Sequence, residues 1–168
     1  MRTLIPDDFA AIQTALSKKG TKNFDRQLEL LATAQPGIFA YIQEVVADEV
    51  ENEADTVVLL ALLLTLSGAI QQAEGRPLKA VPLDELRLRE ESLGRLVDSA
   101  QDFADFDWVQ LWLRDIPQPA VPLFIMQSLV PSDPQDDILS DPQMVPPMFL
   151  WLMTVAECLL RAGPATQT

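Results

Sequence analysis

The chain has 168 residues, of which 48% are hydrophobic and 22% charged, a composition typical of a globular domain that can bury a core without metal or disulfide support. Its net charge of −13 disfavours direct nucleic-acid binding, because such binding needs lysine and arginine to displace counterions from phosphate. The absence of histidine and the single cysteine, Cys158, exclude histidine-activated nucleophiles, thiolate zinc cages and iron–sulfur clusters.

Helix-ending residues divide the first third of the chain into three short helices. Pro6 suits the first position of a helix over residues 6–18, and Gly20 follows its other end. Asn23 fits the cap of a second helix, which ends before Pro36. From residue 38 to about 51, apolar residues recur at helical spacing and predict a third, amphipathic helix.

A leucine-rich segment then predicts the central helix of the fold. It begins at Asp55 or Thr56, is apolar on nearly all sides, and ends at Glu74 before Gly75. Its most apolar part, residues 57–70, and a second apolar stretch, residues 145–156, are both shorter than the roughly 20 residues of a membrane-spanning helix. We therefore expect both stretches to be central helices of a bundle, and we do not expect the chain to enter a membrane.

The second half combines further helices with many prolines. Residues 76–82 predict a crossover with some extended structure, followed by helices over about 83–103, 106–116, 120–129 and 146–161. Eight of the 13 prolines lie between residues 117 and 147, and residues 131–145 predict a long acidic loop.

The pattern as a whole predicts an all-α fold. No stretch shows sustained alternation of period two, which a half-buried strand would require. We expect a compact single domain over residues 1–168, a bundle of about six to eight helices around the apolar helix 55–74. A proline-rich irregular segment is expected in the last third.

Two trios of carboxylates are the candidate metal ligands, because each repeats the spacing i, i+4, i+7 that places side chains on one helix face. They are Glu44, Asp48 and Glu51, and Asp98, Asp102 and Asp105. Facing acidic helices of this kind resemble, in outline, the magnesium sites of all-helical nucleotide pyrophosphohydrolases. That family uses ExxE and ExxD motifs with basic residues for the phosphates, and this chain lacks that pattern. We therefore expect solvated helix faces, with no metal and no cofactor; a Mg²⁺- or Mn²⁺-dependent hydrolase is the alternative.

Large aromatic and sulfur-containing side chains are the candidate partner-binding residues, since tryptophan anchors interfaces and methionine adapts to varied partners. They are Trp108, Trp112, Met144, Met148 and Trp151. One interpretation is a groove held open by rigid prolines, and the other is ordinary core packing. Cys158 lies four residues from Thr154 on an apolar face and is expected to be a small buried residue rather than a nucleophile.

These observations predict a non-catalytic, cytoplasmic protein that binds another protein, with a basic surface as the favoured partner. An immunity protein, an antitoxin, a secretion chaperone and an adaptor all fit, and the sequence does not choose among them. A mimic of nucleic acid is a further alternative, in which the carboxylates project outward at phosphate-like intervals. The basic residues between Arg76 and Arg95 either pair along exposed helices or contact the acidic face of a second copy in a homo-oligomer.

Overall fold

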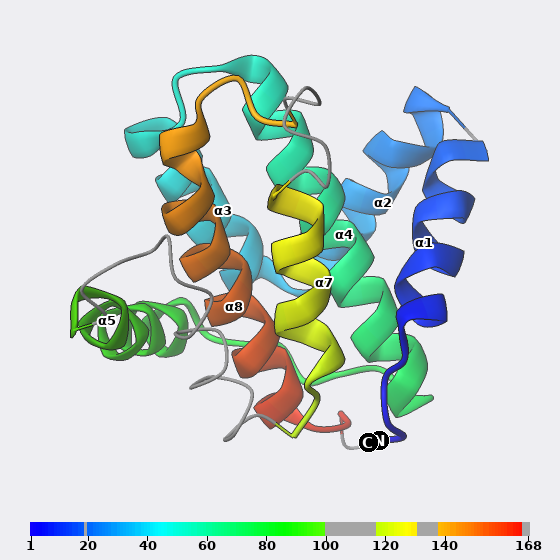
Figure 1. Cartoon of the computed structure of the whole chain (residues 1–168). Helices are drawn as coiled ribbons and strands as arrows, with labels where there is room; N and C mark the ends of the chain where they lie inside the picture. The colour runs from blue at the N-terminus through cyan, green and yellow to red at the C-terminus, as the bar shows by residue number, and fades with distance from the viewer. Residues whose placement is uncertain (19, 100–116, 131–137, 166–168) are drawn as a thin grey trace.

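The protein is an all-α bundle, as the sequence predicts (Figure 1). The computed structural model describes residues 1–18, 20–99, 117–130 and 138–165, and these form seven α-helices, one 3-10 helix and no strand. The helices are α1 (Pro6–Lys18), α2 (Thr21–Ala34), α3 (Pro36–Glu49), α4 (Glu53–Glu74), α5 (Leu83–Ser99), α7 (Ala120–Leu129), the 3-10 helix η1 (Pro142–Met144) and α8 (Val145–Ala162).

Local side-chain chemistry explains where the helices begin and end. Asn52 caps α4, because its Oδ1 accepts a hydrogen bond from the backbone N–H of Ala54 at 2.8 Å, and the helix therefore starts two residues before the predicted Asp55. Gly75 ends α4 with a φ of 72°, in the left-handed region that favours glycine. The prediction for Asn23 was wrong: α2 begins at Thr21, so Asn23 lies inside the helix.

The core is built on two apolar helices, which correspond to the two apolar stretches of the sequence. Leu59, Leu63 and Leu66 of the predicted central helix α4 are completely buried. In α8, every residue from Met148 to Leu159 except Leu150 is buried. Helix α8 contacts α4, α5 and α7, while α4 also contacts α1 and α2. In Figure 1, α4, α7 and α8 stand side by side, and α5 is seen nearly end-on beside α8.

Two helices of the fold have the length and composition of membrane spans, and both are largely buried by the rest of the protein. Glu53–Glu74 and Pro142–Ala162 are long and apolar enough to cross a bilayer, so the length argument made from the sequence was wrong. In the fold, however, 56% of the first apolar window and 61% of the second are buried by the rest of the protein. This burial is compatible with core helices of a soluble protein.

The connection between α4 and α5 is held against the start of α3. A Cβ added to Gly37 would lie 2.2 Å from the carbonyl oxygen of Val81, so this close approach requires glycine. Gln35 binds the same segment: its Nε2 donates to the carbonyl of Lys79 at 3.0 Å, and its Oε1 accepts from the N–H of Val81 at 2.9 Å. The extended structure predicted here is present as a single antiparallel bridge between Leu78 and Pro164.

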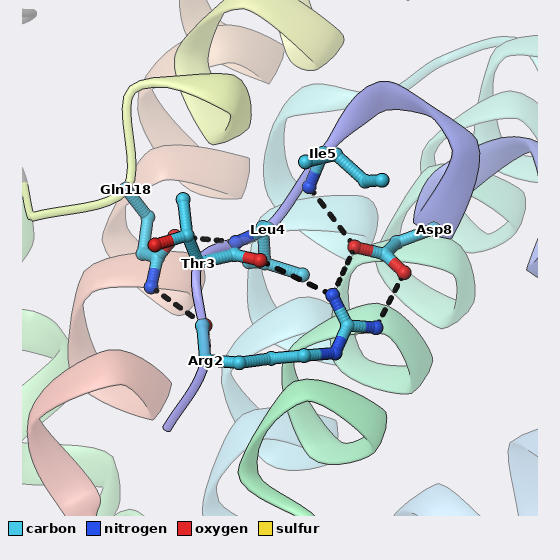
Figure 2. A network of polar contacts seen from close by, with 6 residues as sticks. All are labelled: Arg2, Thr3, Leu4, Ile5, Asp8 and Gln118. Atoms are coloured by element: carbon cyan, nitrogen blue, oxygen red, sulfur yellow. Dashed lines mark hydrogen bonds and ion pairs between the residues drawn. The ribbon is translucent and has the colours of Figure 1, made fainter.

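The N-terminal segment is fastened by a second glutamine (Figure 2). The Oε1 of Gln118 accepts from the N–H of Leu4 at 2.8 Å, and its Nε2 donates to the carbonyl of Arg2 at 3.1 Å. The Arg2 guanidinium pairs with the Asp8 carboxylate, and the N–H of Ile5 donates to the same carboxylate at 2.9 Å. These contacts, with Arg2 the stronger, lower the pKa of Asp8 to about 2.

Candidate functional site

The end of α3, the turn that follows it and the start of α4 carry four exposed carboxylates, which we call the acidic corner: Asp48, Glu49, Glu51 and Glu53. None of them forms an ion pair with any other residue in the part of the chain that the structure describes. Residues 27–75 contain eight acidic residues and no basic one. Charge of one sign that is not neutralised locally produces a surface field able to attract a basic molecule.

The two trios considered as metal ligands do not form a site among the described residues. Glu44 is engaged by Arg87, with Nη2 and Oε1 2.8 Å apart, and Glu51 lies beyond the end of α3 at Glu49. Asp48 is exposed and unpaired in this part of the structure. The side chain of Asp98 and the whole of Asp102 and Asp105 lie outside the described residues. No three Asp, Glu or Cys side chains within the described ranges are grouped as metal ligands.

The candidate partner-binding residues fall in different places. Met148 is completely buried and Trp151 is 3% exposed, because α8 has neighbouring helices on most of its sides. For these two residues, the structure agrees with the core-packing interpretation. Met144 in η1 is partly exposed. Trp108 and Trp112 lie outside the described residues, so the proposed groove around them stays a prediction.

An apolar groove that the sequence did not indicate lies between α2, α3 and α4. Its volume is about 310 Å³, and its wall is almost entirely apolar. Leu28 of α2, Phe39 and Val46 of α3, and Leu60 of α4 line it and remain partly exposed. Their helical spacing correctly indicated apolar faces, but periodicity does not show whether the facing helices close over those faces.

Carboxylates stand along the edges of this groove. Glu29 lines the α2 edge, and Asp25 lies one turn earlier on the same helix face. Glu53, which belongs to the acidic corner, lies one turn before the lining residue Thr56 on α4. All three are exposed and unpaired within the described chain. Two cations are also exposed on α2: Lys22 lies two turns before Glu29, and Arg26 lies three residues before Glu29 without forming an ion pair with it.

A polar cluster lies inside the packing of α3, α5 and α8. Burial raises the pKa of Glu90, while Tyr41 and Trp151 beside the carboxylate partly oppose that rise. Burial also raises the pKa of Tyr41, and the nearby charge of Glu90 raises it further. Burial, followed by the charge of Glu85, raises the pKa of the Cys158 thiol to about 12. Cys158 is therefore a buried, protonated side chain at neutral pH, as the sequence predicts.

Arginines of α5 form ion pairs within the chain. Arg87 contacts Glu44 of α3, Arg89 contacts Glu157 of α8, and Arg95 contacts Glu91 on α5 itself. The sequence suggested that these arginines pair along exposed helices of the same chain. They do pair within the chain, but two of the three pairs join different helices. Contact with the acidic face of a second copy stays a prediction.

Comparison of the chain with protein-family models, curated proteins and solved structures gives no match.

Proposed function

We propose that the protein acts without catalysis, by binding a partner protein that presents a basic surface to the acidic corner. One observation carries this proposal: Asp48, Glu49, Glu51 and Glu53 are exposed together and have no ion-pair partner in the described part of the chain. Like charges held close together repel one another, and a cationic partner relieves that repulsion. The same field accelerates encounter with a basic protein and rejects acidic competitors.

This role suits an immunity protein, an antitoxin, a secretion chaperone or an adaptor in the cytoplasm. The exposure of several unpaired carboxylates also supports a more specific candidate, a mimic of nucleic acid. The partner would then be a nucleic-acid-binding protein, and added duplex DNA would compete with this chain for it. A partner of the other types would not be displaced by DNA.

The test compares two variants that lose four negative charges each. The first replaces the acidic corner (Asp48→Asn, Glu49→Gln, Glu51→Gln, Glu53→Gln). The control replaces four exposed carboxylates elsewhere (Asp7→Asn, Asp84→Asn, Glu85→Gln, Glu91→Gln). Each immobilised protein is incubated with cell lysate at low salt, and retained proteins are eluted with a salt gradient and identified.

We expect the wild type and the control to retain the same basic protein, and the corner variant to retain about tenfold less of it. High salt should release that protein, because surface charges are screened. Retention of nothing basic by the wild type, or equal retention by both variants, would contradict the proposal.

A further inference from the structure

We propose that the groove between α2, α3 and α4 is a docking site for an amphipathic, basic helix of the partner protein. This inference rests on the proposed function and specifies how the partner is recognised. The groove has a volume of about 310 Å³ and an apolar wall. Asp25, Glu29 and Glu53 supply negative charge along its edges.

Beside the lining residue Leu60, α4 exposes a further apolar side chain, which we call the groove rim. Val57 is 51% exposed and lies three residues before Leu60, so both side chains share one face of α4. Leu28 and Val46 approach from the two other helices. A partner helix that places apolar residues at i, i+3, i+4 and i+7 would cover this surface with a continuous stripe.

The charge along the groove edges favours a basic partner helix over an acidic one. Basic residues on the two sides of the apolar stripe would face Glu29 on the α2 edge and Glu53 on the α4 edge, neither of which has an ion-pair partner in the described chain. An acidic helix would add to the existing repulsion at these edges. A strand is a poor alternative, because no strand edge exists among the described residues to extend.

A second copy of this chain is a less suitable occupant. Both copies would carry a net charge of −13, which opposes their association. On α5, which exposes Leu88, the arginines Arg87, Arg89 and Arg95 are already paired with carboxylates of the same chain. A distinct, basic protein is therefore the occupant that complements the groove.

The experiment uses the full-length chain and a synthetic peptide of about 15 residues, with leucines at i, i+3, i+4 and i+7 and lysines at the other positions. A scrambled peptide of identical composition has the same charge and no apolar stripe. Affinity is measured by fluorescence anisotropy of the labelled peptides at low and high salt. A neutral fluorescent fatty alcohol is measured in parallel as a small apolar probe.

Two pairs of variants separate the contribution of apolar contacts to peptide affinity from the contribution of charge. Val57→Asn alters the groove rim, and Leu88→Asn is the matched control at a side chain that is 69% exposed on α5. The double variant Glu29→Gln with Glu53→Gln removes two of the three carboxylates along the groove edges, and Asp84→Asn with Glu91→Gln removes the same charge from α5. Thermal denaturation verifies that all four variants remain folded.

We expect the amphipathic peptide to bind the wild type at least about tenfold more tightly than the scrambled peptide. Val57→Asn and the Glu29/Glu53 double variant should each weaken binding by about fivefold to tenfold, while both controls leave it unchanged. Equal affinity for the two peptides, or equal effects of groove and control variants, would overturn the docking site. Binding of the fatty alcohol without the peptide would also overturn it, and would make the groove a small-ligand pocket.

The experiments distinguish a wrong docking site from a wrong proposed function. If the acidic-corner variant loses the captured partner and Val57→Asn retains it fully, the function stands and the docking site is wrong. If the wild type captures no basic protein, the function itself is wrong.

Discussion

Two buried glutamines bind extended segments of the chain through backbone groups that the helices around them do not satisfy. Gln35 and Gln118 are each 5% exposed, and each accepts from one backbone N–H while donating to the carbonyl two residues earlier. In an extended backbone those two groups point to the same side, so one side-chain amide satisfies both. Nothing in the sequence distinguishes these glutamines from exposed ones, because their partners are 44 to 116 residues away.

Replacing Gln118 by leucine should destabilise the protein by about 2–4 kcal/mol, because the N–H of Leu4 and the carbonyl of Arg2 would lose their partners. Gln13→Leu, at an exposed position on α1, is the control and should change stability by less than about 0.5 kcal/mol. Urea denaturation followed by circular dichroism gives both values. Equal stability of the two variants would show that the amide of Gln118 does not hold the N-terminal segment.

At the scale of helices, the sequence predicted the order of elements and most boundaries, because glycine, proline and asparagine act locally. Gly75 ends α4 where predicted, and Pro36 separates α2 from α3. Asn52 was missed as a cap because Asp55 and Thr56, three and four residues later, are equally good capping types. The contact of α5 with α3 and α8 depends on tertiary packing, and so the burial of Glu90 could not be predicted.

The raised pKa of Glu90, a residue of α5, predicts how the stability of the protein depends on pH. Because the folded pKa exceeds the ordinary value of 4.5, the folded state holds the proton more strongly than the unfolded state. Ionised Glu90 therefore costs stability above its folded pKa, and this cost disappears as the pH falls below 4.5. Glu90→Gln should raise the Tm at pH 7, and this gain should vanish near pH 4.

Thermal denaturation of Glu90→Gln and of Glu91→Gln across this pH range tests the prediction. Glu91 is exposed and pairs with Arg95, so its substitution controls for the change in net charge. A gain in Tm for Glu90→Gln that persists unchanged at low pH would contradict burial of the carboxylate as its cause.

At the scale of the whole molecule, hydrophobic periodicity was enough to predict an all-α bundle with α4 at its centre. It also indicated a second central helix at residues 145–156, where α8 lies, although the methionines and prolines around residues 142–153 also fitted an exposed groove. The groove in the structure lies instead between α2, α3 and α4. It depends on how closely three helices pack, which a one-dimensional pattern does not specify. Its acidic edges, in contrast, follow from charges visible in the sequence.

Amide hydrogen exchange of the full-length chain, with and without the basic protein captured from lysate, tests the proposed recognition most directly. Binding in the groove predicts slower exchange in residues 25–32, 39–46 and 53–60, with α5 and α8 unchanged. Slower exchange confined to α5, α7 or α8, with these three segments unaffected, would contradict it.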